Sequence, residues 1–176
     1  MADVGLVGFP NAGKSTLISN ISKVRSKIAP YPFTTKQPIL GFVIGEKLEF
    51  VIADLPGIIE GAHAGKGLGD KFLKHAERTK IIALIVDMAG TEGRDPLDDY
   101  KQVIKEVGSY SEDLLARVKV IVANKMDLPE SKVHLKRFKA KIKKPIFEIS
   151  ALEKKGLEAF VATLEKLLCK ENSPEK

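Results

Sequence analysis

The residues with the clearest chemical pattern lie near the N-terminus, in a segment that matches the phosphate-binding sequence G-x-x-x-x-G-K-S. Glycines in such a loop let successive backbone N–H groups point at phosphate oxygens, and the helix that follows adds its positive end. The lysine would reach the β- and γ-phosphates, and the serine hydroxyl would coordinate Mg²⁺. The segment comprises Gly8, Phe9, Pro10, Asn11, Ala12, Gly13, Lys14 and Ser15, and Thr16 follows it. It predicts a nucleotide as the ligand.

A second motif, Asp54-Leu55-Pro56-Gly57, follows an expected strand. A carboxylate at the C-terminal end of that strand would lie beside the phosphate loop. We therefore expect Asp54 to hold Mg²⁺ through a water molecule and the Gly57 N–H to reach the γ-phosphate. The same four residues could otherwise form an ordinary turn, so the prediction depends on their position after the strand.

The segment Asn124-Lys125-Met126-Asp127 ends another expected strand, and Asp127 could select the base. A carboxylate accepts hydrogen bonds from both the N1–H and the 2-amino group of guanine, whereas adenine offers neither in that arrangement. Guanine is therefore favoured over adenine, and an ATPase or nucleotide kinase is the disfavoured alternative. In isolation, these residues would suit a strand-to-helix turn.

The last expected strand ends at Ser150-Ala151-Leu152, where backbone N–H groups could meet the guanine carbonyl oxygen. This segment is weak evidence alone. It follows the other motifs in the expected order, so we include its three residues in the predicted nucleotide site.

Thr34 and Thr35 lie between the first expected helix and the second expected strand, in a stretch (25–38) that fits neither helix nor strand. A threonine hydroxyl there can complete the magnesium shell when the γ-phosphate is present and release it after hydrolysis. We favour Thr35 as the ligand. Phe33 and Thr34 beside it are included in the predicted nucleotide site.

Short apolar runs rich in Val and Ile alternate with segments of helical period, which indicates an α/β protein. The expected strands are 3–7, 39–44, 48–53, 81–87, 119–123 and 146–149. The expected helices are 14–22, 70–78, 96–107, 131–142 and 157–169, with a further helix start capped by Ser111. The second and third strands are joined too closely for a crossover, so they must form an antiparallel hairpin. We predict a three-layer P-loop fold with helices on both faces of a six-stranded, mostly parallel sheet that has one antiparallel strand.

The length of 176 residues suits one substantial core, and we expect residues 1–170 to form one domain and residues 171–176 a frayed tail. No apolar run reaches the roughly 18 to 20 residues of a membrane-spanning helix, and the sequence does not open on a signal-type segment. Cys169 is the single cysteine, which fits a reducing compartment. These features predict a cytoplasmic protein without a membrane span.

The net charge of +6 agrees with an acidic partner such as a nucleotide or RNA. Residues 132–144 form an acid-free basic stretch that could contact ribosomal RNA through phosphates. The default interpretation of such a stretch is the solvated face of a helix. Val133, Leu135, Phe138 and Ile142 are expected on the buried side of that helix.

Together these motifs resemble those of the TRAFAC GTPases, and the segments between them resemble the Obg family. The likeness extends from Asp3 to about Leu168, and its more specific segments are 31–35, 54–63, 72–79 and 93–96. It implies slow hydrolysis of GTP to GDP with Mg²⁺, and a role with the large ribosomal subunit or in growth and stress control. We expect a monomer. Members of the family carry a glycine-rich N-terminal domain, so we expect this chain to be an excised GTPase domain.

Lys14, Thr35, Gly57 and Asn11 are the candidate catalytic residues. Ras-like enzymes orient the attacking water with a glutamine, but the corresponding residue here is Ile58, which can neither donate nor accept a hydrogen bond. In some related GTPases an asparagine at the position of Asn11 ligates K⁺ between the phosphates, although Asn11 could instead stabilise its own turn. The alternative to an enzyme is a binding module that reports nucleotide state to the ribosome and barely turns over unaided.

Overall fold

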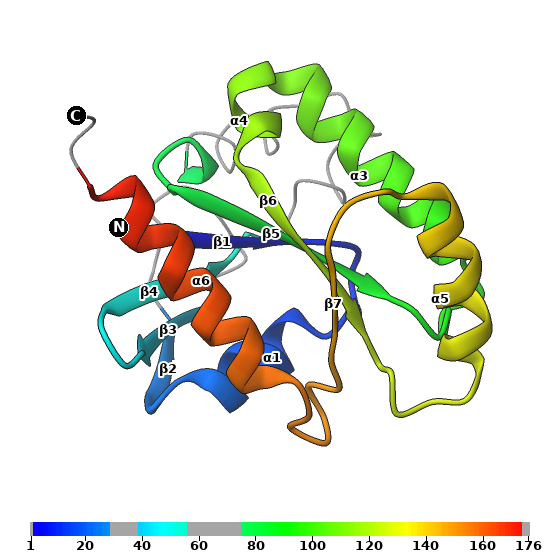
Figure 1. Ribbon diagram of the computed structural model, residues 1–176, viewed down its shortest axis with the longest axis horizontal. Helices are drawn as coiled ribbons and strands as arrows, with labels where there is room; N and C mark the ends of the chain where they lie inside the picture. The colour runs from blue at the N-terminus through cyan, green and yellow to red at the C-terminus, as the bar shows by residue number, and fades with distance from the viewer. Residues whose placement is uncertain (1, 29–38, 56–74, 174–176) are drawn as a thin grey trace.

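The computed structural model of the chain describes residues 2–28, 39–55 and 75–173 (Figure 1). The strands are β1 Val4–Val7, β2 Val24–Ile28, β3 Ile39–Ile44, β4 Glu49–Asp54, β5 Ile81–Asp87, β6 Val118–Asn124 and β7 Ile146–Glu148. The helices are α1 Lys14–Ile21, α3 Pro96–Tyr110, α4 Glu112–Ala116, α5 Glu130–Lys141 and α6 Leu157–Glu171. Within the described residues, no helix is long and apolar enough to cross a membrane.

All the strands belong to one sheet in the order β2-β3-β4-β1-β5-β6-β7. Strand β1 pairs in parallel with β4 and β5, and the parallel pairing continues through β6 to β7. Strand β3 pairs antiparallel with β2 and with β4. The predicted α/β class is confirmed, and so is the antiparallel hairpin of β3 and β4, in which β3 runs against the other strands.

The sheet has one strand more than the six that the sequence predicts. Strand β2 begins at Val24 and takes in the first four residues of the stretch 25–38 that fitted neither helix nor strand, and it pairs with the outer side of β3. Its sequence, VRSKI, has apolar residues only at its two ends, so it lacks the apolar run by which the other strands were recognised. An edge strand is held by backbone bonds on one side, so it needs less apolar sequence than a buried central strand.

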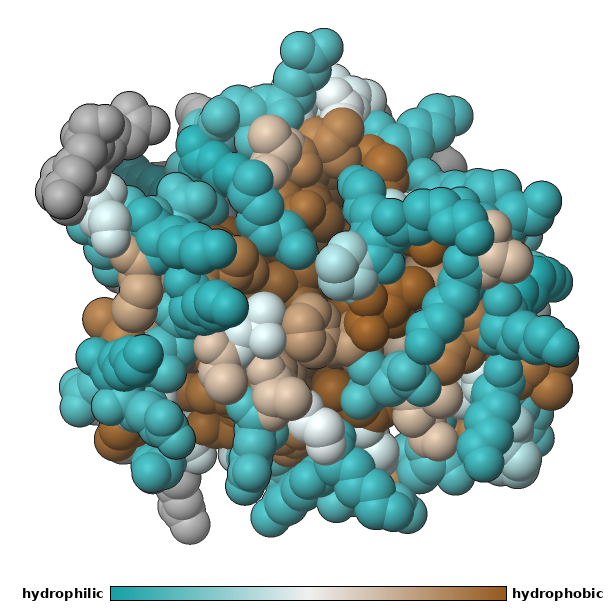
Figure 2. Space-filling view, in the orientation of Figure 1, coloured by the Kyte–Doolittle hydropathy of each residue, from teal (hydrophilic) through white to brown (hydrophobic). Residues whose placement is uncertain are grey.

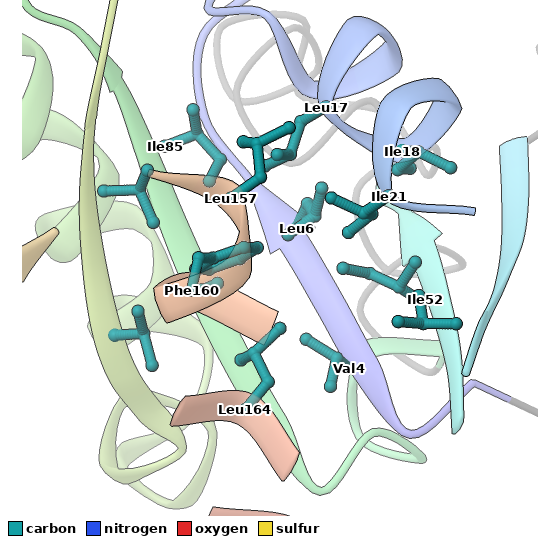
Figure 3. Packing of buried hydrophobic residues seen from close by; sticks show 14 of the residues in the cluster. Val4, Leu6, Leu17, Ile18, Ile21, Ile52, Ile85, Leu157, Phe160 and Leu164 are labelled. Carbon is teal, nitrogen blue, oxygen red and sulfur yellow. The ribbon is translucent and has the colours of Figure 1, made fainter. Parts of the chain in front are cut away.

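Alternate residues of β5 face two separate cores, which makes the molecule three layers deep. Ile82, Leu84 and Val86 pack in the core under α3, α4 and α5. Ile81, Ala83 and Ile85 pack in the other core, under α1 and α6. Figure 3 shows side chains of α1 and α6 meeting those of the sheet in this second core. Every residue of β5 is buried, as expected for a central strand covered on both faces.

Helices α3 and α4 each begin at a side-chain cap. The Asp95 carboxylate accepts a hydrogen bond from the Leu97 N–H at 2.8 Å at the start of α3, and the Ser111 hydroxyl accepts one from the Leu114 N–H at 3.2 Å at the start of α4. The cap predicted at Ser111 is thereby confirmed. Most of the helix expected over residues 70–78 lies outside the described residues.

Helix α5 buries a narrower face than its sequence predicts. Leu135 and Phe138 are buried, but Val133 is 73% exposed, so its predicted burial is wrong. Ser131 is fully buried instead, because its hydroxyl donates to the carbonyl oxygen of Lys125 at 2.6 Å. Ser131 therefore faces the protein at the start of α5, and Val133, two residues later and so about 200° around the helix, faces solvent.

Candidate nucleotide-binding site

A pocket of about 620 Å³ opens where the carboxyl ends of β1, β4 and β6 meet the start of α1. Open α/β sheets bind ligands at this edge. The predicted residues that line it are Gly8, Pro10, Asn11, Gly13, Lys14, Ser15, Thr16, Asp54, Asn124, Lys125, Asp127, Ala151 and Leu152. Thr91 and Leu128 also line it and were not predicted. The predicted Phe33, Thr34, Thr35 and Gly57, and also Ile58, lie outside the described residues.

The phosphate loop, residues 8–15, requires glycine at two positions. Gly13 has a φ of 101°, and a Cβ there would lie 2.1 Å from the side-chain nitrogen of Asn124. A Cβ at Gly8 would lie 2.4 Å from the carbonyl oxygen of Ile85 in β5. The two glycines therefore let the loop lie against β5 and the end of β6 without side chains in between.

The side chain of Lys14 folds back over the phosphate loop. Its ammonium donates to the carbonyl oxygens of Gly8 at 2.9 Å and Phe9 at 3.1 Å, and the residue is only 8% exposed. Lys14 is also the first residue of α1, so its charge adds to the positive end of that helix. This end of the pocket therefore presents fixed positive charge of the kind that binds phosphate groups.

Asn124 joins the phosphate loop to the segment after β7. Its amide nitrogen donates to the carbonyl oxygen of Ala12 at 2.8 Å, and its amide oxygen accepts from the N–H of Ala151 at 3.0 Å. The side chain is 2% exposed. Ala12 does not line the pocket, but this bond holds the loop in place from behind. The three predicted segments are thus held together by one buried side chain.

We expect Asn124→Ala to lower the free energy of unfolding by about 2–6 kcal/mol, because it leaves two buried backbone groups unsatisfied at about 1–3 kcal/mol each. Urea unfolding without nucleotide measures the change. The matched control is Asn172→Ala, which removes an exposed hydrogen bond from Lys80 and should change stability by less than about 0.5 kcal/mol. Equal losses in the two variants would contradict the role given to Asn124.

Ser150 acts through its side chain as well as its backbone. Its hydroxyl donates to the Asp127 carboxylate at 2.7 Å and accepts from the N–H of Glu153 at 3.1 Å. The hydroxyl therefore fixes the orientation of the carboxylate that is predicted to bind the base. The sequence predicted only a backbone contribution from this segment.

Asp87 is a site residue that the sequence analysis missed. It is the last residue of β5 and is 4% exposed. Its carboxylate accepts from the backbone N–H groups of Ala89, Gly90 and Thr91 at 3.0–3.1 Å and from the Lys125 ammonium at 3.1 Å. Lys125 also donates to the Thr91 hydroxyl at 2.9 Å. Asp87 therefore fixes both Lys125 and the loop that brings Thr91 to the pocket. Its signal in the sequence is a lone carboxylate that closes an otherwise apolar strand.

Burial acts to raise the pKa of Asp87, but the hydrogen bonds from Thr91 and Lys125 and the charge of Lys125 outweigh it, so the pKa lies below its usual value of 3.8. A carboxyl whose pKa is lowered by folding stabilises the fold above its unfolded pKa. That contribution is lost as the pH falls below 3.8 and through the lowered pKa of the folded state.

We expect Asp87→Asn to lower the free energy of unfolding by about 1–3 kcal/mol at pH 7, because bonds to a charged acceptor become bonds to a neutral one. The difference from wild type should stay constant down to about pH 5 and shrink below pH 4. Urea unfolding at pH 7, 5 and 3.5 tests this. The control Glu49→Gln changes an exposed acid in β4. A difference that does not shrink in acid would contradict the pKa argument.

The loop between β5 and α3 also contacts the phosphate loop. The Arg94 guanidinium lies 4.5 Å from the centre of the Phe9 ring and pairs with Asp99 at 3.3 Å. The Asn11 amide nitrogen donates to the Glu92 carboxylate at 3.2 Å, and Asn11 has a positive φ of 65°. The segment between β5 and α3 therefore contacts the phosphate loop through Arg94 and Glu92, and it contacts Lys125 through Thr91.

Ser15 and Asp54 fit a magnesium site at the phosphate end of the pocket. Ser15 is in the first turn of α1, Asp54 is the last residue of β4, and both line the pocket. A hydroxyl oxygen and a carboxylate are oxygen ligands of the kind that Mg²⁺ prefers. Among the described residues no group of three His, Cys, Asp or Glu side chains could hold a metal ion.

Residues 3–125 match the protein family described as "50S ribosome-binding GTPase". The chain is 53% identical over 164 residues to the GTPase Obg of Caldanaerobacter subterraneus subsp. tengcongensis, with 92% of this chain and 39% of that protein covered. It is 54% identical over 160 residues to the GTPase Obg of Oceanobacillus iheyensis, with 89% and 38% covered. The chain therefore spans about two-fifths of the length of these curated relatives.

Solved structures share the fold at low sequence identity. The G domain of the T. maritima FeoB iron transporter superposes with a TM-score of 0.70 at 18% identity, with 96% of this chain and 99% of that chain covered. A putative nucleolar GTP-binding protein 1 from Plasmodium falciparum gives a TM-score of 0.65 at 22% identity, with 96% and 86% covered. At this level of identity the likeness extends to the fold alone.

Proposed function

Since this chain belongs to the Obg family of GTPases, we propose that it is a guanine-nucleotide switch that hydrolyses GTP to GDP and phosphate with Mg²⁺. The observation that best supports this is the pair of hydrogen bonds by which Asn124 joins Ala12 to Ala151, beside a pocket lined by residues of all three segments. A phosphate-binding loop alone would fit many nucleotides. The carboxylate of Asp127 at the other end of the pocket favours guanine.

Competition for a fluorescent GDP analogue tests the proposal. The protein is titrated with the analogue in Mg²⁺, and unlabelled GTP, GDP and ATP are then added. We expect GTP and GDP to displace the analogue and ATP to leave it bound. Displacement by ATP alone would overturn the guanine assignment.

We propose the following roles for the residues of the pocket. Lys14 and the loop backbone stabilise phosphate charge, and Ser15 and Thr35 hold Mg²⁺, with Asp54 acting through a water molecule. When bound, the metal neutralises charge on the β- and γ-phosphates. The Gly57 N–H reaches the γ-phosphate, Asp127 binds the base, and the Ala151 backbone meets the guanine carbonyl oxygen.

Intrinsic turnover should be slow. Ile58 stands where Ras-like enzymes have a glutamine and cannot orient the attacking water. Positioning and charge stabilisation by the loop are then the main contributions of this chain to the reaction. We therefore propose that the protein acts mainly as a guanine-nucleotide switch and not as a fast catalyst.

We propose that Asn11 ligates K⁺ beside the phosphates. Its hydrogen bond to Glu92 uses the nitrogen end of the amide, so that the oxygen end can serve as a ligand. We expect single-turnover hydrolysis to be about tenfold or more faster in KCl than in NaCl at equal ionic strength, because the ion stabilises developing charge. Asn11→Gly, which suits the positive φ, should remove the difference. Equal wild-type rates in the two salts would contradict the assignment.

The partners and the compartment are also proposals. We propose that the whole protein acts with the large ribosomal subunit, and the name of the matching family supports this. We propose further that residues 1–170 form one GTPase domain, that it is monomeric, and that it works in the cytoplasm. Sedimentation with purified large subunits, with GDP or a non-hydrolysable GTP analogue, tests the first of these.

A further inference from the structure

The positive charge of this protein is concentrated in one short stretch. Residues 132–144 contain seven basic residues and no acidic ones: Lys132, Lys136, Arg137, Lys139, Lys141, Lys143 and Lys144. The whole chain has 29 Lys and Arg against 23 Asp and Glu. Without these seven, 22 basic residues remain against 23 acidic ones, so the rest of the chain is almost neutral. We call these seven side chains the α5 basic surface.

All seven side chains are exposed, on α5 and on the loop that follows it. Two of them have acidic partners: Arg137 pairs with Asp95, and Lys139 pairs with Glu148 at 2.9 Å. The other five have no ion pair with any residue in the described part of the chain. Figure 2 shows long hydrophilic side chains over the edge of the molecule where α5 lies. Most of this charge is therefore available to a partner.

The positions of the basic residues on α5 are not explained by the stability of the helix. Lys132 lies in the first turn of α5, where the positive end of the helix disfavours a cation. Lys132 and Lys136 are four residues apart and so repel each other, and Arg137 and Lys141 do the same. Only Lys139 and Lys141, in the last turn, are favoured by the helix dipole. These unfavourable charge interactions destabilise α5. We therefore look for the function of the basic residues in binding a partner.

We propose that the α5 basic surface binds the phosphate backbone of RNA. Charges three or four residues apart recur about every 5–6 Å along the helix axis, which suits a polyanion with regularly spaced charges. Of the aromatic rings on α5, Phe138 is fully buried, and the half-buried ring of His134 is hydrogen-bonded through Nδ1 to the carbonyl oxygen of Met88 at 2.8 Å, so α5 presents no fully exposed ring on which a base could stack. The surface therefore contacts phosphates without reading sequence. None of the seven side chains lines the nucleotide pocket, so this binding does not depend on the proposed GTPase function.

Fluorescence anisotropy with a labelled RNA duplex of about 20 base pairs, titrated from about 50 to 300 mM KCl, tests the proposal. The variant carries Lys132→Glu, Lys136→Glu and Lys143→Glu. We expect it to lose at least about tenfold in affinity at 100 mM KCl, and its slope of log affinity against log salt to fall by about 2–3, one for each phosphate contact removed. Its affinity for GDP should match that of the wild type.

The matched control carries Lys101→Glu, Lys105→Glu and Lys166→Glu, three exposed lysines on α3 and α6, and has the same net charge. It should keep most of the RNA affinity. Equal losses in the two triple variants would mean that only net charge matters and would overturn the proposal. Polyglutamate that binds as tightly as the RNA through the same three lysines would also overturn it, in favour of an acidic protein partner. Loss of GDP binding in any variant would show damage to the nucleotide site, which the GDP titration detects separately from a change in RNA affinity.

Discussion

Replacement of Lys14 by alanine should reduce single-turnover GTP hydrolysis by about 10²–10³-fold, the usual effect of removing one preorganised group that stabilises charge in the transition state. The ammonium is held over the phosphate loop by the carbonyl oxygens of Gly8 and Phe9. Its loss removes positive charge from the phosphate end of the pocket and removes the donor to the Gly8 carbonyl oxygen, whereas the Phe9 carbonyl oxygen keeps its hydrogen bond from the Ala12 N–H at 3.2 Å. Phosphate release at saturating GTP and enzyme in excess measures the rate.

The matched control is Lys23→Ala, which removes an exposed lysine two residues after the end of α1. It should hydrolyse GTP at the wild-type rate. The thermal unfolding midpoint of each variant shows whether the fold is kept. A Lys14→Ala protein that folds and keeps most of its activity would contradict the role of this residue in phosphate stabilisation.

Asp127→Asn should exchange guanine for xanthine as the preferred base. In the proposed role the carboxylate would accept two hydrogen bonds from guanine, each worth about 1.5–3 kcal/mol to a charged group, so GDP affinity should fall by about 100-fold or more. An amide presents one acceptor and one donor, which matches the N1–H and the 2-oxo group of xanthine. The Ser150 hydroxyl donates to one oxygen of Asp127, and the same bond would orient the amide oxygen in the variant.

Titration of the variant with fluorescent GDP and with xanthosine diphosphate measures both changes. Asp113→Asn, which alters an exposed acid on α4 paired with Arg117, serves as the control and should bind GDP normally. Undiminished GDP binding by Asp127→Asn would remove the basis for guanine selection at this residue.

The sequence was sufficient for the parts of this protein that depend on neighbouring residues. The phosphate loop could be recognised because its glycines, lysine and serine act within one turn of chain, between a strand and a helix. The apolar run of β5 and the cap at Ser111 are similarly local. The order of the motifs along the chain then placed Asp54 at the end of β4, Asn124 at the end of β6 and Ser150 just after β7, and hence at one edge of the sheet.

The contacts that join those motifs could not be read from the sequence, because each connects residues far apart along the chain. Asn124 and Ala12 are 112 residues apart, and Asp87 and Lys125 are 38 apart. Both bonds exist because β5 lies between β1 and β6, an order that local patterns do not specify. Strand β2 has the same origin, because it pairs with the edge of β3, which follows it after a long connection. Local chemistry specified which residues could bind a nucleotide, and the packing of the sheet specified which side chains hold them in place.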